Sequence, residues 1–159
     1  MKKFLSILIS LFLLLSFFVV PASAVAPSDV DVTIEQEQIV VSRTVEQLGD
    51  GCYFIETIYV PNAQLYSNTK TGTKTAECVY YGTTIFTISV TGVFTYDGST
   101  SEATSASGKI AAYAENVTLN SRRAYTSGAS AIATCSISYN GSTIQKTVTL
   151  TCDKNGNLS

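Results

Sequence analysis

The sequence contains no histidine and no tryptophan. Without histidine, the chain cannot build the Ser-His-Asp or Cys-His arrangement that activates a nucleophile in many hydrolases. A zinc site is not expected either, because no two of the four cysteines form a C-x-x-C pair and no imidazole can complete the site. The glycine patterns of P-loops and of dinucleotide-binding folds are also missing. The composition therefore argues against an enzyme and predicts no metal and no cofactor.

Charged residues are scarce, at 14% of the chain, and acidic residues outnumber basic ones. A protein that binds nucleic acid or an anionic membrane surface needs a basic face. We therefore expect neither as a partner.

The first residues have the pattern of a secretory signal peptide. A basic start (MKK) precedes an apolar run over residues 4–20, and Ala22–Ala24 supplies the small residues of an A-x-A cleavage site. We expect a mature, extracellular protein that begins at Val25. The alternative is that the apolar run stays as a membrane anchor, since it is about long enough to span a bilayer.

The remaining chain has the composition of a single all-β domain. From Val25 onward it contains 36 serines and threonines and all nine tyrosines, residue types that suit the pleated surface of a sheet. The predicted organisation is a signal peptide (1–24), a polar segment with one weak strand (25–38) and a β-sandwich domain (39–159).

Alternating polar and apolar residues and turn signals locate the strands. Residues 62–72 read as a loop, Arg122 and Arg123 as part of a polar stretch between strands, and Asp97-Gly98 as a two-residue type I′ hairpin turn. Expected strands cover residues 29–35 (weak), 39–48, 52–60, 85–96 and about 99–113, followed by a C-terminal hairpin, and the strands 39–48 and 52–60 are expected to form a hairpin around the turn at 49–51. Residues 73–81 are either an edge strand, which Lys70 and Lys74 would protect from pairing with another chain, or a solvated loop. These seven or eight short strands predict an antiparallel two-sheet sandwich of Ig-like architecture, which typically has about seven strands. The alternative is a small β-barrel.

The C-terminal hairpin allows its register to be predicted. If Asn140-Gly141 is a two-residue turn, the numbers of paired residues sum to 281, so that Ile137 faces Ile144 and Ala133 faces Val148. Both apolar sets then fall on one face of the sheet, whereas a slip of one residue would turn one set to solvent.

This register limits the pairing of the four cysteines, Cys52, Cys78, Cys135 and Cys152. It separates Cys135 from Cys152 by six residues of strand, about 20 Å, too far for a disulfide bond. If oxidised, each is expected to pair with Cys52 or Cys78 across the sandwich; the alternative is that the thiols are free.

Two segments resemble a group of small secreted bacterial proteins. Residues 90–100 (VTGVFTYDGST) are similar to a T-G-x-F-T-Y-(D/N)-G hairpin, and residues 147–159 to a T-x-x-C-x-x-x-G-x-L-S ending. Members of the group often have a Trp at the place of Phe86 and a Cys at the place of Ala103 or Thr104. The resemblance implies the compartment and the fold, and no chemistry.

Three functions remain. The first is a secreted, non-catalytic interaction module that binds an extracellular protein or a surface polymer. The second is a carbohydrate-binding module, which would stack Tyr80, Tyr81, Tyr113 and Tyr125 on sugar rings and would then present them as a coplanar row. The third, much weaker, is a glycosidase-like hydrolase, whose two carboxylates would come from Glu56, Glu77, Asp97, Glu102 and Glu115.

One further segment has the pattern of a binding loop. Asp153 to Asn157 resembles the start of a calcium loop, but the acid that such a loop needs at its twelfth position has no counterpart before Ser159. The segment is therefore expected to be a polar tail.

Overall fold

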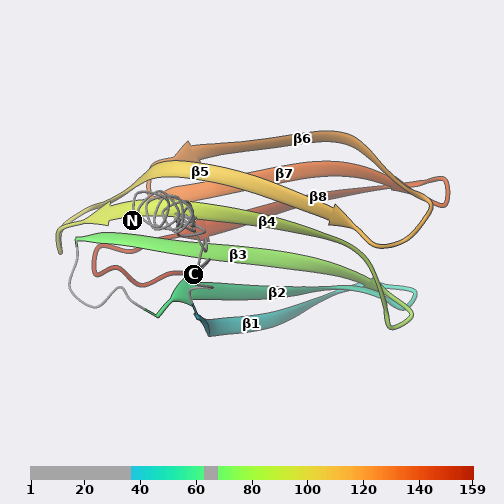
Figure 1. The fold of residues 1–159 in the computed structure, drawn as a ribbon, viewed down its shortest axis with the longest axis horizontal. Helices are drawn as coiled ribbons and strands as arrows, with labels where there is room; N and C mark the ends of the chain where they lie inside the picture. The colour runs from blue at the N-terminus through green and yellow to red at the C-terminus, as the bar shows by residue number, and fades with distance from the viewer. Residues whose placement is uncertain (1–36, 63–67) are drawn as a thin grey trace, which may run out of the picture. The chain divides into compact units, whose positions relative to one another are not determined.

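The computed structural model of the protein describes residues 37–62 and 68–159, and these form eight antiparallel strands (Figure 1). The predicted signal peptide and the weak strand at 29–35 lie outside the described residues. The strands are β1 (Gln38–Gly49), β2 (Cys52–Pro61), β3 (Thr69–Tyr80), β4 (Thr83–Tyr96), β5 (Ser101–Ala112), β6 (Val117–Ser127), β7 (Ser130–Tyr139) and β8 (Ser142–Thr151).

The strands form two sheets that pack face to face, which confirms the predicted sandwich. One sheet has the order β1-β2-β3-β4-β5 and the other the order β6-β7-β8. The smaller sheet packs against β3, β4 and β5, and the two sheets do not close into a barrel. Each sheet is a simple meander, so the chain passes from one to the other once, after β5, without the Greek-key connections of an immunoglobulin domain.

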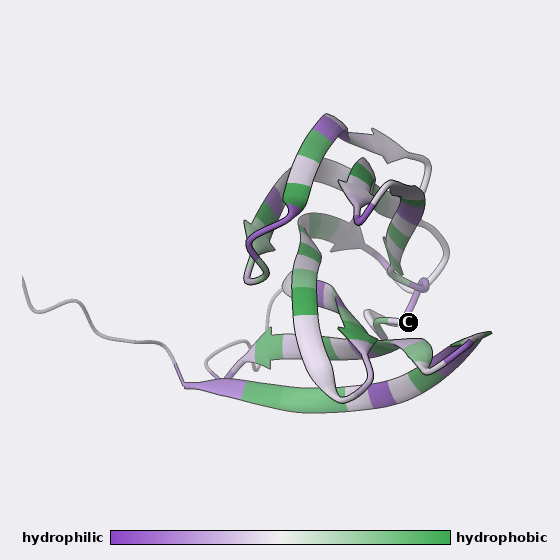
Figure 2. Cartoon of the chain, turned by 90° about the vertical axis from the view of Figure 1, so that its right-hand side faces the viewer, coloured by the Kyte–Doolittle hydropathy of each residue, from purple (hydrophilic) through white to green (hydrophobic). Residues whose placement is uncertain are grey.

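Alternation along β4 and β7 builds the core, as predicted. In β4 the even-numbered residues from Phe86 to Phe94 are buried, and in β7 Ala131, Ala133, Cys135 and Ile137 are buried. Figure 2 shows hydrophobic and polar residues alternating along the strands. We call the side of the five-stranded sheet that meets this core its inner face and the opposite side its outer face.

The register of the C-terminal hairpin is confirmed. Every pair in β7 and β8 sums to 281, including Ile137 with Ile144 and Ala133 with Val148. Asn140 and Gly141 have φ values of 49° and 81°, as a type I′ turn requires. The predicted hairpin of β1 and β2 around residues 49–51 also forms.

The interpretation of residues 62–81 is wrong on two points. β3 begins at Thr69, inside the predicted loop, and it lies in the centre of the sheet between β2 and β4 rather than at an edge. The segment is a strand and not the alternative loop, and Lys74, predicted to protect an edge, instead forms an ion pair with Glu56 of the neighbouring strand at 3.3 Å.

The turn after β4 also differs from the prediction. A four-residue loop, residues 97–100, joins β4 to β5, and among its residues only Gly98 has a positive φ. The Asp97 carboxylate closes the loop by accepting hydrogen bonds from the backbone N–H groups of Thr100 and Ser99, at 2.7 and 2.8 Å. These bonds lower the pKa of Asp97. A side chain therefore takes the place of the backbone geometry of a type I′ turn.

Arg122 and Arg123 lie in the middle of β6, not in a loop as predicted. β6 is an edge strand with mostly exposed side chains, so it lacks the buried alternation that identifies a strand in sequence. The Arg123 guanidinium lies 4.8 Å from the centre of the Tyr125 ring.

The C-terminal segment folds back onto the end of β8. Cys152 pairs with Leu158 in an isolated antiparallel bridge. The Asp153 carboxylate accepts bonds from the side chain of Asn157 and from the backbone N–H groups of Asn157 and Asn155, and these bonds lower its pKa. Its oxygens thus hold a turn of the chain itself.

A buried cation connects the two sheets at the β1–β2 side. The Lys146 ammonium group of β8 lies 2.6 Å from Glu46 of β1 and 2.9 Å from Glu56 of β2, and 4.3 Å from the centre of the Phe54 ring. Burial disfavours the charged form of Lys146, but the two carboxylates outweigh that effect and raise its pKa.

Candidate binding face

The outer face of the five-stranded sheet carries a row of polar side chains that crosses every strand. Arg43, Thr57, Thr75, Ser89 and Lys109 are successive cross-strand neighbours from β1 to β5. Three hydroxyl groups therefore lie between two cations. Neighbouring strands are about 4.8 Å apart, so the row spans about 19 Å.

A groove of about 650 Å³ follows this face. Hydroxyl side chains dominate its lining, and β2, β3 and β4 supply most of them. The lining residues are Ile55, Thr57, Tyr59, Thr75, Glu77, Thr83, Thr84, Thr87 and Tyr113. Thr57 is only 8% exposed although it belongs to the outer face, so the groove has depth at this point.

Glu77 supplies the one carboxylate among the described residues that line the groove. It lies on β3 between Ile55 of β2 and Thr87 of β4. The Thr84 hydroxyl donates a hydrogen bond to its Oε1 atom. Because an ionised carboxylate offers about four acceptor positions, Glu77 can accept further bonds from a ligand.

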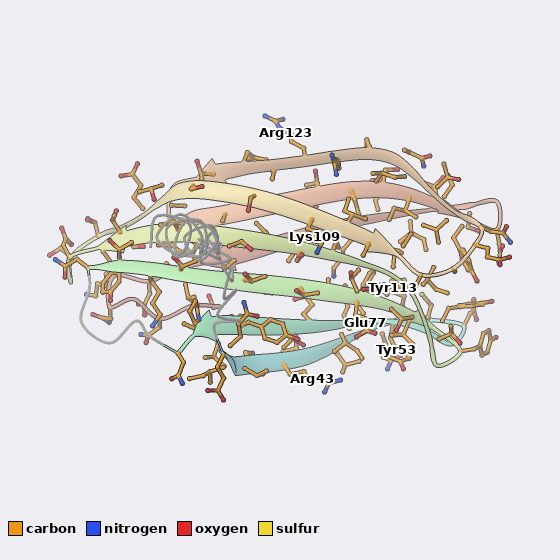
Figure 3. The ribbon with its side chains drawn as sticks, in the orientation of Figure 1. Arg43, Tyr53, Glu77, Lys109, Tyr113 and Arg123 are labelled. Atoms are coloured by element: carbon orange, nitrogen blue, oxygen red, sulfur yellow. The ribbon has the colours of Figure 1, made fainter. Side chains whose placement is uncertain are left out.

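Two tyrosines contribute aromatic surface to the lining. Tyr59 comes from β2, and Tyr113 directly follows β5 with 63% of its surface exposed. The backbone N–H of Tyr113 donates to the carbonyl of Ile85 at 2.9 Å, which fixes this exposed residue against the sheet. Figure 3 shows Glu77, Lys109 and Tyr113 along this sheet.

The four tyrosines proposed from the sequence do not form the coplanar row expected of a sugar-binding platform. Tyr80 and Tyr81 lie at the turn between β3 and β4 with their rings inclined by 76°. Tyr125 belongs to the other sheet. Of the four, only Tyr113 lines the groove.

Sequence reasoning missed Tyr59 and the threonines of the groove. Their signal in the sequence is weak: the odd-numbered positions of residues 53–59, 73–77 and 87–91 carry mostly polar or aromatic side chains. Nothing in this pattern indicates that side chains from three strands line one hollow.

The candidate carboxylates do not form a pair at this groove. Glu56 points to the inner face, where Lys146 and Lys74 bind it and, against the opposing effect of burial, lower its pKa. Asp97 closes the loop after β4. Glu102 and Glu115 are exposed and lie outside the groove lining.

All four cysteines are free thiols in the structure, which is the alternative that the sequence left open. Cys135 pairs with Lys146, while the N–H of Cys152 bonds to Ala129, so the predicted separation of these two cysteines along the hairpin is confirmed. Burial, with a smaller effect of the adjacent Cys52, raises the pKa of Cys78 to about 12.

Within residues 37–62 and 68–159, no three His, Cys, Asp or Glu side chains gather in a way that could hold a metal ion. The same part of the chain contains no helix long and apolar enough to cross a membrane.

Comparison with known proteins gives no assignment: no family model, no curated protein and no solved structure matches the chain.

Proposed function

We propose that this protein is an exported, non-catalytic binding module, and that the groove on the outer face of its five-stranded sheet holds the ligand. The observation that carries the proposal is the lining of the groove. Five threonine hydroxyls, one carboxylate and two tyrosines line it, and all but Tyr113 lie on paired strands of the sheet. A concave site with several oriented polar groups and some aromatic surface is the usual form of a small binding site.

The arrangement of carboxylates favours binding over hydrolysis. Glycoside hydrolysis needs two carboxylates that flank the scissile bond. Glu77 stands alone in the lining, and Glu56, the nearest candidate along the neighbouring strand, belongs to the opposite face of the sheet.

Export is supported by the sequence. The basic start, the apolar run and the A-x-A site fit a cleaved signal peptide, and the resemblance of residues 90–100 and 147–159 is to secreted bacterial proteins. We therefore propose an extracellular protein or surface polymer as the partner, and neither nucleic acid nor membrane. N-terminal sequencing of protein from the culture medium is expected to begin at Val25; an intact Met1 in a membrane pellet would contradict export.

The binding face is tested by retention of the protein, expressed from the full chain, on insoluble bacterial cell-wall material and on immobilised extracellular matrix protein. Retention on at least one of the two is expected. Tyr113→Ala removes the exposed ring from the groove and is expected to weaken retention about tenfold. Tyr125→Ala is the matched control, because it removes the same side chain from the other sheet.

Far-UV circular dichroism and urea unfolding would verify that both variants fold. Retention that Tyr113→Ala leaves unchanged, or that both variants lose equally, would show that the outer face is not the binding surface. Absence of retention of the wild-type protein on both materials would contradict the proposed function.

A further inference from the structure

We infer that the ligand of the groove is a neutral polysaccharide; this inference rests on the proposed function and names its ligand class. It follows from the hydrogen-bonding character of the lining, from its charge and from the position of the groove in the sheet.

The lining offers groups that both donate and accept hydrogen bonds. Thr57, Thr75 and Thr87 lie on three adjacent strands, about 4.8 Å apart across the sheet, while residues on one side of a strand repeat about every 6.8 Å along it. A hydroxyl group is both donor and acceptor. An array of hydroxyls at these spacings complements a ligand that itself carries many hydroxyls.

Two further features suit a sugar ring. The Glu77 carboxylate can accept bonds from adjacent hydroxyls of a sugar, because Thr84 occupies only part of its capacity. The Tyr113 ring is exposed, and Tyr59 adds a second ring to the same lining. Aromatic rings provide rigid apolar surface with a polar end, which matches the apolar C–H face of a pyranose.

The position of the groove argues against an extended peptide. A peptide that adds to a sheet bonds to the free backbone groups of an edge strand. The floor of the groove comes from β2, β3 and β4, each of which has a paired neighbour on both sides. A ligand in the groove therefore meets side chains rather than a free backbone edge.

The charge of the groove argues against a polyanion. Arg43 and Lys109 stand at the two margins of the sheet, and neither belongs to the groove lining. The charged group that does line it is Glu77, and the protein as a whole is acidic, with a formal charge of −2. A polymer of acidic sugars would bring its charges close to this carboxylate, which is unfavourable.

The test is affinity electrophoresis of the folded protein in native gels that contain a β-glucan, a xylan, a galactomannan or, as the acidic comparison, polygalacturonate. Retardation by at least one neutral polymer is expected. Thr75→Val removes one groove hydroxyl at nearly constant volume and is expected to weaken binding about fivefold. Tyr113→Ala is expected to weaken binding about tenfold.

The matched controls are Thr149→Val and Tyr125→Ala. Both make the same chemical change on the three-stranded sheet, away from the groove, and are expected to leave the retardation unchanged. A loss of retardation that is equal in groove variants and controls would overturn the inference.

The remaining outcomes separate this inference from the proposed function. Retardation by polygalacturonate alone, weakening with added salt, would overturn neutrality. If none of the four polymers retards the protein but Tyr113→Ala still weakens retention on matrix protein or cell-wall material, the inference of a polysaccharide ligand is overturned and the proposed binding face stands. Absence of both retardation and retention would overturn the two together.

Discussion

Replacing Lys146 by methionine is expected to destabilise the sandwich, because this buried ammonium group connects β8 to β1 and β2. Methionine preserves the length and apolar stem of the lysine side chain and removes its charge. The side chain of Lys146 is only 10% exposed, whereas those of its partners Glu46 and Glu56 are 57% and 19% exposed.

The contacts of Lys146 set the size of the expected loss. Glu46 is largely exposed, and its bond contributes about 0.5 kcal/mol, as surface ion pairs do. Glu56 is more buried but keeps Lys74 at 3.3 Å, so losing its bond to Lys146 costs about 1.5 kcal/mol. The contact with the Phe54 ring adds about 0.5 kcal/mol. The methionine variant no longer has to desolvate an ammonium group, which offsets part of this loss of stability. The expected net loss in the free energy of unfolding is about 2 kcal/mol.

The assay is urea unfolding followed by circular dichroism. With a slope of about 1.5 kcal/mol per molar, a loss of about 2 kcal/mol lowers the midpoint by about 1.3 M. Lys154→Met is the matched control, because Lys154 lies exposed on the C-terminal turn, and its effect is expected to stay within about 0.5 kcal/mol. In a double-mutant cycle with Glu56→Gln, a coupling energy of about 1 kcal/mol is expected.

Buried ion pairs often contribute nothing beyond what an apolar replacement would provide. If Lys146→Met unfolds at the same urea concentration as the wild-type protein, or at a higher one, the contacts of Lys146 do not stabilise the sandwich. A coupling energy near zero with Glu56→Gln would refute the assignment of the larger share to that pair.

Three other measurements test particular features. Because the pKa of Glu56 is lowered in the folded protein, the ionised Glu56 carboxylate stabilises the fold at pH values above the ordinary pKa of 4.5. This stabilisation is lost as the pH falls through the lower pKa of the folded state. The stability difference between wild type and Glu56→Gln should therefore shrink from about pH 6 to about pH 3. Gly156→Ala places a Cβ 2.5 Å from the Tyr96 ring at a φ of +84° and should cost about 2 kcal/mol in urea unfolding; Gly98→Ala, with the same φ and open space around it, should cost about 1 kcal/mol, and equal losses would contradict the contact. The Cys78 thiol, with a pKa raised to about 12, should react with iodoacetamide far more slowly at pH 8 in the native protein than in urea. Equal rates in both states would contradict the burial of this thiol. The contribution of Cys78 to stability should be lost as the pH rises above about 9.

Local signals determined which parts of the fold were predictable. The hairpin of β7 and β8 follows from Asn140-Gly141 and from two apolar sets that must share one face, so its register could be read without knowledge of any other strand. The strand β4 was equally predictable from the sequence, because its alternation of polar and apolar residues is long and its inner face is fully buried.

The order of strands in a sheet has no such local signal. β3 has lysines at Lys70 and Lys74, which favour an edge strand when read alone. Lys74 instead serves an ion pair with Glu56 inside the sheet. Whether a lysine protects a sheet edge or pairs with a carboxylate depends on which strand lies beside it. The packing of the whole sandwich determines that strand order.

The groove was the least predictable feature, because a single bulge decides part of its lining. β3 and β4 pair as Cys78 with Phe86, but beyond this point as Val79 with Thr84, so Ile85 is an extra residue in β4. Without the bulge, Ile85 would oppose Val79 and stand on the outer face. With it, Ile85 is 2% exposed in the core, and Thr84 reaches the outer face, where it bonds to Glu77.

In the sequence this bulge is marked by the adjacent apolar residues Ile85 and Phe86, because two neighbouring apolar residues interrupt a strict alternation. Such a pair occurs equally at the end of a strand, so the sequence alone does not distinguish a bulge from a strand that has stopped. Only the pairing with β3, which continues through residues 83 and 84, shows that the strand runs on. The polar character of the groove at this end therefore arises from a tertiary constraint: the core takes both apolar residues, and the shifted register places the Thr84 hydroxyl on the outer face.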